Sequence, residues 1–175
     1  MMCAMRVYIR PPRPEDERAY SEAVVRSADH LGPWNPVEPD GLPELVLRQG
    51  TALRSFMIFD HEDDGLVGRV NVANIVRGRF RNASLGYDSY VPYAGTGRMT
   101  EGLRLIVDRC FAAGPDGLGL HRLEINVQPE NERSLAMAKR LGFRHEGYSP
   151  RMLHLNGDWR DHERFALTAE EWPGA

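Results

Sequence analysis

The sequence has few cysteines, no long apolar run and no marked excess of charge of either sign. Its two cysteines, Cys3 and Cys110, stand in the N-terminal segment and in an apolar helical pattern, so no disulfide is expected and a reducing cytoplasm fits. Arg6 and Arg10 interrupt the N-terminal segment early, which argues against a signal peptide. No stretch approaches the roughly 18–20 apolar residues of a membrane span, so no membrane partner is expected.

Charge balance and histidine spacing exclude two further classes of protein. Lys and Arg number 22 against 25 Asp and Glu, a formal net charge of −3, whereas a duplex-binding domain usually carries a basic excess. We therefore expect no nucleic-acid partner. The histidines, His162 among them, lack the spacing with cysteine or carboxylate that zinc ligands show, and no metal is expected. An apolar content of 42% over 175 residues predicts one globular domain spanning 1–175.

Hydrophobic periodicity and turn residues predict a mixed α/β domain built around one central sheet. The expected order is β-α-α-β-β-β-α-β-α-β-β. The last two strands flank Asn156-Gly157, because Asn-Gly between extended runs is a strong hairpin signal. The other expected elements are a strand at 7–9, helices near 14–31 and 40–47, three antiparallel strands between 55 and 87, a helix at 99–113, a strand at 121–127 and a helix at 131–141.

A glycine loop, Gly95-Thr96-Gly97, stands between the third of these strands and a helix. Strand, Gly-x-Gly and helix together favour phosphate binding, because glycines let the backbone come close and the first N–H groups of a helix have no internal partner. The dinucleotide fingerprint is incomplete, since no third glycine occupies position 100, and no Walker-type Gly-Lys-Ser or Gly-Lys-Thr occurs. A plain glycine turn before a core helix is the alternative.

Three further segments resemble the GNAT N-acetyltransferases, in the order in which that family has them. Residues 87–103, YDSYVPYAGTGRMTEGL, resemble its pyrophosphate loop, and 123–131, LEINVQPEN, resemble its fifth strand and the start of the next helix. In the third, residues 146–148, EGY, and 155–162, LNGDWRDH, are similar to those of the branch that holds the ribosomal-protein alanine N-acetyltransferases. Two positions depart from the family pattern: Ala94 replaces Gln or Arg, and Met99 replaces a small residue.

The resemblance implies a GNAT fold, with a mostly antiparallel sheet of about six to seven strands, about four helices, and strands 4 and 5 splayed apart at an acetyl-coenzyme A site. It implies acetyl-coenzyme A as the acyl donor. The residues implied to bind it come from the fourth strand, the glycine loop and the helix after the fifth strand: Leu85, Gly86, Tyr87, Gly95, Thr96, Gly97, Arg98, Met99, Thr100, Asn131, Arg133 and Ser134.

Acetyl transfer to an amine needs an acid for the leaving thiolate and a neutral attacking amine. Ser134 is the candidate acid and Tyr148 the alternative, although Ser134 and Asn131 also suit plain helix capping. Related enzymes are thought to use a glutamate on the strand before the Asn-Gly turn, where this sequence has Leu153. Glu124 acting through water is the candidate base, and a structural acceptor is its other interpretation.

The acceptor is expected to be a primary amine. An α-amine has a pKa of about 7.7–8.0 against about 10.4 for lysine, so a site with a weak base favours the N-terminal α-amine of a protein such as a ribosomal protein. Small amines (antibiotic, amino sugar, polyamine, arylamine) and a non-catalytic acyl-coenzyme A-binding module are the alternatives. A homodimer is left open, as is any ligand of Arg77, Arg79 and Arg81. The residues expected to contact the acceptor are Trp34, Tyr90, Asn126 and Trp159.

Overall fold

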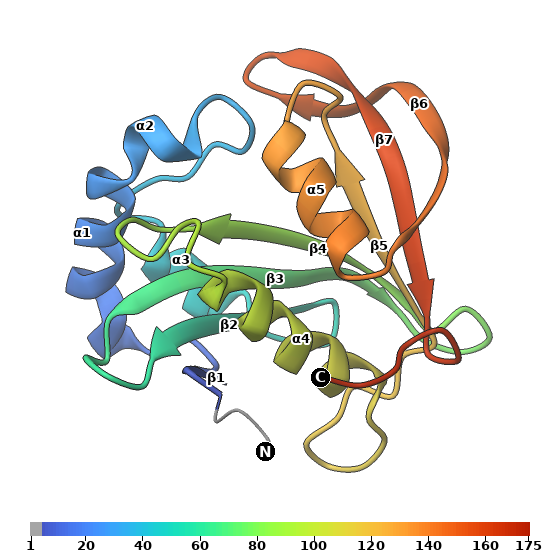
Figure 1. The fold of residues 1–175 in the computed structure, drawn as a ribbon, viewed down its shortest axis with the longest axis horizontal. Helices are drawn as coiled ribbons and strands as arrows, with labels where there is room; N and C mark the ends of the chain where they lie inside the picture. Colours follow the sequence, from blue (N-terminus) through green and yellow to red (C-terminus); the bar gives the residue numbers. More distant parts are fainter. Residues whose placement is uncertain (1–4) are drawn as a thin grey trace.

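The computed structural model describes residues 5–175, which form one sheet with helices on both of its faces (Figure 1). Cys3 lies outside the described residues. The strands are β1 (Val7–Arg10), β2 (Leu53–Asp60), β3 (Leu66–Val76), β4 (Asn82–Ser89), β5 (Arg122–Val127), β6 (Arg144–Leu155) and β7 (Asp158–Thr168). The helices are a 3-10 turn (Pro14–Asp16), α1 (Glu17–Arg26), α2 (Ala28–Leu31), α3 (Leu42–Leu47), α4 (Arg98–Phe111) and α5 (Glu132–Arg140). None of these helices is long and apolar enough to cross a membrane.

The sheet divides where β4 meets β5. Its strand order within residues 5–175 is β1-β2-β3-β4-β5-β7-β6, and every neighbouring pair is antiparallel except β4 and β5. That parallel pair holds for only three residues on each strand, Asn82–Ser84 against Arg122–Glu124, and the strands then diverge (Figure 1). The expected fold class, including splayed strands 4 and 5, is confirmed.

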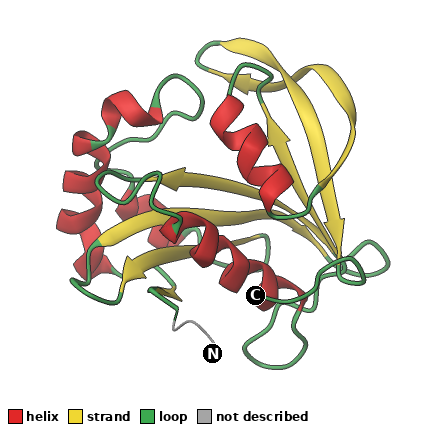
Figure 2. Ribbon diagram, in the orientation of Figure 1, coloured by secondary structure: helices red, strands yellow, loops and turns green. Residues whose placement is uncertain are grey.

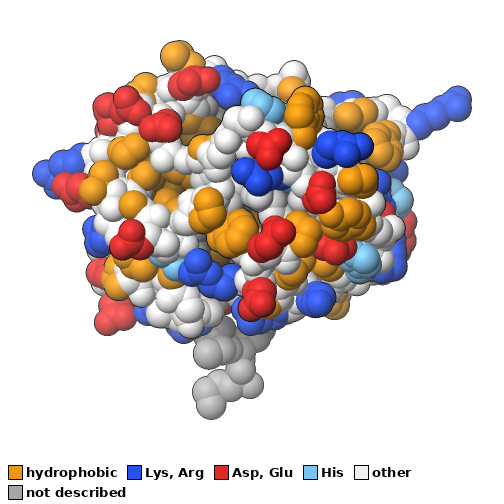
Figure 3. All heavy atoms as spheres, turned by 90° about the horizontal axis from the view of Figure 1, so that it is seen from above, with side chains coloured by type: hydrophobic (Ala, Val, Ile, Leu, Met, Phe, Trp, Pro, Cys, Tyr) orange, Lys and Arg blue, Asp and Glu red, His pale blue; other side chains and the backbone are white. Residues whose placement is uncertain are grey.

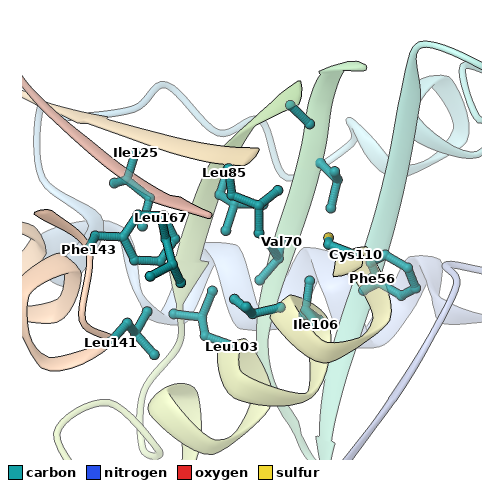
Figure 4. Close-up of a cluster of buried hydrophobic side chains, with 14 of the residues drawn as sticks. Phe56, Val70, Leu85, Leu103, Ile106, Cys110, Ile125, Leu141, Phe143 and Leu167 are labelled. Carbon is teal, nitrogen blue, oxygen red and sulfur yellow. The ribbon is translucent and has the colours of Figure 1, made fainter. Parts of the chain in front are cut away.

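One face of the sheet is covered by α4 and α5, which cross in front of the strands in Figure 2. Leu103, Ile106 and Cys110 of α4 are fully buried there and lie against sheet side chains such as Val70 and Leu85 (Figure 4). The start of α4 approaches the sheet closely. A Cβ on Gly68 of β3 would lie 2.5 Å from the backbone carbonyl oxygen of Asp88 and 2.6 Å from the sulfur of Met99, so glycine is required there.

The opposite face is covered by α1 and α3, but only over the N-terminal half of the sheet. Tyr20, Val24 and Leu42 pack there against Met57 of β2. Tyr90, expected to contact the acceptor, is instead fully buried in this second core, and we correct that expectation. The face is left without a helix where β4, β5 and β7 lie, since both of these helices pack on β2 and its neighbours.

Two elements differ from their expected bounds. The helix expected over 14–31 breaks at Ser27, whose buried hydroxyl accepts a hydrogen bond from the Val91 N–H (3.0 Å). Strand β6 begins at Arg144, well before the hairpin segment that the sequence predicts. The early part was not predicted because irregularities between His145 and Gly147 and between Ser149 and Leu153 disturb the alternation that marks a strand.

Candidate active site

Two chambers flank the divergence of β4 and β5. The first chamber has a volume of about 350 Å³ and lies between residues 95–100, α5 and the segment 30–35. The second chamber, about 280 Å³, lies on the sheet face that no helix covers and is lined from β3, β4, β5 and the β6–β7 hairpin. The two chambers share five lining residues, so they meet at one junction: Trp34, Asn35, Tyr87, Asn131 and Ser134.

The glycine loop closes one end of the first chamber. Gly95 and Gly97 have φ of 80° and 85°, in the left-handed region that favours glycine. Gly97 caps α4 without a side-chain hydrogen bond, and the backbone N–H groups of the first helical turn have no partner inside the helix. Gly95, Gly97, Met99 and Thr100 line the chamber. This end is therefore suited to an anion such as a phosphate.

Asp60 of β2 and Arg6, which directly precedes β1, hold the loop in place. Arg98 pairs with Asp60, which is 1% exposed. Burial alone would raise the pKa of that carboxyl, but the hydrogen bond from Arg98 holds it below its usual value. Arg6 donates to the carbonyl of Thr96 (3.2 Å) and pairs with Glu101. Neither Arg98 nor Thr96 lines a chamber, and their side chains are engaged with Asp60 and with the Tyr93 carbonyl.

A pair of hydroxyls marks the junction. The Tyr87 and Ser134 hydroxyl oxygens are 2.9 Å apart, and the Asn131 side chain accepts from the Ser134 N–H (3.2 Å), so Asn131 caps α5 as one interpretation expected. Burial raises the pKa of Tyr87 to about 12, a shift that the hydrogen bond to Ser134 reduces. The phenol keeps its hydrogen at neutral pH and can donate it to Ser134, which frees the serine hydrogen for a ligand.

The segment 30–35 spans the gap between β4 and β5 and is hydrogen-bonded to Gln128, directly after β5, and to α5. Arg133 of α5 donates to His30 Nδ1 (2.5 Å) and to the His30 carbonyl (2.8 Å). The Gln128 amide donates to the carbonyl of Trp34 (2.7 Å). Because His30 Nδ1 accepts a hydrogen bond from Arg133, the ring hydrogen is on Nε2. His30 Nε2 lies 3.0 Å from the hydroxyl oxygen of Ser89. Burial and the Arg133 charge lower the pKa of His30.

The second chamber is lined by neutral polar and apolar groups. Asn71, Ser84, Asn126 and Gln128 supply amides and a hydroxyl, and among its described lining residues none carries a carboxylate. The side-chain oxygen of Asn126 is buried and has no hydrogen-bond partner within residues 5–175. His162 of β7 also lines it and is 2% exposed. The chamber therefore offers hydrogen bonds and one imidazole to an occupant.

The structure brings twelve of the residues expected at the site to these chambers and leaves six outside, namely Tyr90, Thr96, Arg98, Glu124, Tyr148 and Trp159. Glu124 faces Arg122, with 3.1 Å between its carboxylate and Nε. Tyr148 is about half exposed and donates to Asp161, which raises its pKa to about 12. Trp159 is 57% exposed on the hairpin. The expected residues that line a chamber are Trp34, Leu85, Gly86, Tyr87, Gly95, Gly97, Met99, Thr100, Asn126, Asn131, Arg133 and Ser134.

Sequence reasoning missed several lining residues. Met137 and Arg140 lie four and seven positions after Arg133, so helical spacing was a signal that could have found them. Gln128 follows Asn126 on the same face of β5 by alternation. His162 had no such signal, because its place depends on how β7 pairs with β5.

Comparison with known proteins is consistent with this geometry. The family model for an acetyltransferase (GNAT) domain matches residues 6–144. The [ribosomal protein uS5]-alanine N-acetyltransferase of Escherichia coli K12 is 31% identical over 97% of this chain and 91% of its own. The solved structure of Mycobacterium smegmatis RimJ in complex with CoA-disulfide has a TM-score of 0.81 at 33% identity, covering 97% of this chain and 85% of that one. The spermidine N(1)-acetyltransferase of E. coli K12 is 26% identical over 98% of this chain and 91% of its own.

Replacing Arg133 tests the hydrogen bonds between Arg133 of α5 and His30. Arg133→Met removes the positive charge beside His30, so the pKa of His30 is expected to rise toward its ordinary value, as followed by NMR titration. Arg140→Met is the matched control, since it removes the same charge two helical turns further along the same chamber, where no histidine is paired with it. A His30 pKa that responds equally to both substitutions would show that the pairing does not form.

Proposed function

The chain belongs to the GNAT acetyltransferase family, and on that premise we propose that it acetylates the N-terminal α-amine of a protein, such as a ribosomal protein. It is an N-acetyltransferase that uses acetyl-coenzyme A as donor. The observation that carries the choice of acceptor is the second chamber, which has no carboxylate among its described lining residues and opens at the Tyr87–Ser134 pair. The cytoplasm, where ribosomal proteins are made, is the proposed location.

The donor occupies the first chamber in this proposal. Its pyrophosphate lies on the N–H groups of the glycine loop and the start of α4. Its pantetheine arm runs along β4 from Leu85 to Tyr87, where pairing with β5 has ended and the backbone edge is available for hydrogen bonds. An N–H of that edge polarises the thioester carbonyl and holds the oxyanion that develops during attack.

The acceptor enters the second chamber and meets the thioester at the junction. The neutral amine nitrogen attacks the carbonyl carbon, the N–C bond forms and the C–S bond breaks. Ser134 is the acid that passes a proton to the leaving thiolate, with Tyr87 donating to the serine oxygen behind it. No acyl-enzyme is formed.

The lining of the second chamber favours an α-amine over a polyamine. Spermidine carries several positive charges, and burying them without carboxylates would be costly. Acidic and basic side chains are also interspersed on the face that Figure 3 shows, which forms no single-sign field to attract a polycation. An α-amine with a pKa of about 7.7–8.0 brings at most one charge and loses it readily. The E. coli relative named for a ribosomal-protein alanine supports the same acceptor.

The acceptor class is tested by coenzyme A release with four substrates. They are a peptide with a free N-terminal alanine, the same peptide acetylated at its N-terminus, an N-blocked lysine peptide, and spermidine. The free peptide is expected to have a kcat/KM at least about 100-fold above the others, because it alone presents a readily neutralised amine on a peptide chain. Mass spectrometry locates the acetyl group. Faster turnover of spermidine or of the lysine peptide would contradict the proposal.

A pair of substitutions at Gly95 tests the placement of the pyrophosphate. Asp and Asn both tolerate positive φ, and a Cβ at Gly95 meets nothing within 4 Å, so the two variants differ only in charge. Gly95→Asp is expected to raise KM for acetyl-coenzyme A about tenfold or more above Gly95→Asn, because it sets a negative charge against the phosphates. Equal KM values in the two variants would place the pyrophosphate elsewhere.

Ser134→Ala tests the acid. It leaves the Ser134 N–H on the Asn131 cap, so α5 is expected to keep its start. We expect kcat to fall about 10–100-fold while the dissociation constant for coenzyme A, from calorimetry, changes little. Ser21→Ala on α1 makes the same chemical change away from both chambers and serves as the control. An unchanged kcat would leave Ser134 with a capping role alone.

A further inference from the structure

The second chamber contains a histidine, His162, that the mechanism expected from the sequence does not use. An amine attacks only after it has lost its extra proton, and that proton needs an acceptor near the junction. Of the described residues that line this chamber, Tyr87 and His162 alone have ionisable side chains. Tyr87 has a pKa of about 12 and is already protonated at neutral pH, so it cannot take the proton. His162 is the group that remains.

The residues considered from the sequence do not fill this role. Leu153 lines the second chamber at the position where related enzymes are expected to carry a glutamate, and it has no group to accept a proton. The carboxylate of Glu124 faces Arg122, and Glu124 lines neither chamber. His162 lies on β7, two residues along from the partner of Leu153, Arg160, so it reaches the same part of the chamber from the neighbouring strand.

The ring of His162 is held in the tautomer that a base requires. Its Nδ1 lies 3.0 Å from the backbone carbonyl oxygen of Arg160. A carbonyl oxygen can only accept a hydrogen bond, so Nδ1 carries the hydrogen and Nε2 of the neutral ring carries the lone pair. Nε2 has no hydrogen-bond partner among residues 5–175, and His162 lines the second chamber, so this nitrogen is available to an occupant there.

The groups that surround His162 are mostly uncharged. The neighbouring face of β5 presents Asn126 and Gln128, and Ser149 of β6 pairs directly with His162. Arg164 follows two residues along the same face of β7, and the adjacent Asp161 carboxylate accepts from Tyr148 and from the Arg151 N–H. Arg160 lies two residues in the other direction on the same face of β7, where it pairs with Asp158, so two positive charges and one engaged negative charge lie near the ring. The unpartnered Asn126 oxygen offers a second acceptor that can orient an amine N–H.

We propose that His162 is the general base of the reaction, which takes the proton from the acceptor's ammonium group, and this rests on the proposed function. His162 Nε2 removes one proton and leaves a neutral amine with a lone pair. That nitrogen bonds to the thioester carbon, and the C–S bond breaks. The second proton, which the nitrogen loses as the amide forms, balances the one that the thiolate takes up through Ser134. His162 then releases its proton to solvent, and no other reactant is needed.

The test compares His162→Asn with the unaltered protein on two acceptors. Asn keeps a donor for the Arg160 carbonyl but has no titratable nitrogen. With the alanine peptide at pH 7 we expect kcat/KM to fall about 10–100-fold. The remaining rate is expected to rise steadily with pH, as the ammonium group of the peptide loses its proton to solvent. With an aminooxy-terminated peptide, whose nitrogen is neutral at pH 7, the loss is expected to stay below about threefold.

Two further variants separate chemistry from folding. His162→Gln, a second replacement without a titratable nitrogen, is expected to reproduce the pH profile of His162→Asn, and both variants are expected to keep the thermal stabilisation that coenzyme A gives. His154→Asn is the matched control on the β6–β7 hairpin, since His154 lies between two lining residues but lines neither chamber. It is expected to behave as the unaltered protein does.

The outcomes distinguish this inference from the proposed function. An unaltered protein that does not acetylate the alanine peptide would contradict the proposed acceptor. An unaltered protein that acetylates it, with His162→Asn retaining full kcat/KM at every pH or losing activity equally on both peptides, would overturn the role of His162 alone.

Discussion

The three-residue pairing of β4 with β5 is the constraint on which the rest of the structure depends. A sheet that paired fully at this place would have no opening, and backbone groups left unpaired in a protein interior cost free energy unless something satisfies them. Here the divergence leaves the edge of β4 beyond Ser84 facing two chambers that meet at Tyr87 and Ser134. The early end of this pairing thus creates both chambers, which we propose hold the donor and the acceptor, and the place where they meet.

The opening persists because its rim is held from several directions. Asp60 and Arg98 form a mostly buried ion pair behind the glycine loop, and Arg69 and Asp88 form another beneath the first chamber. Removing one partner of the buried Arg69–Asp88 pair typically costs about 3–5 kcal/mol, because a buried charge is left alone. The segment 30–35 is tied across the gap by Arg133 and Gln128. These contacts keep both chambers open without help from strand pairing at that point.

Local patterns predicted the parts of the site that are local in origin. Gly95 and Gly97 predicted the turn with positive φ that precedes α4, and Asn131 predicted the start of α5, because turn and cap preferences act over a few residues. The prediction that Tyr90 contacts the acceptor was wrong because the packing of α1 and α3 on the sheet buries this side chain. His162 was overlooked because only the register of β7 against β5 brings it to the second chamber, and register is a property of the whole sheet.

A crystal structure with a bisubstrate inhibitor, in which the coenzyme A sulfur is joined through an acetyl bridge to the N-terminal nitrogen of an alanine peptide, tests the central claim most directly. We predict that the coenzyme A half fills the first chamber, with its pyrophosphate on the glycine loop and its sulfur beside Ser134. The linked nitrogen is predicted to lie in the second chamber within hydrogen-bond reach of His162 Nε2, with the peptide leaving past Leu153. A peptide that leaves over another face, with the second chamber empty, would contradict the two-chamber arrangement.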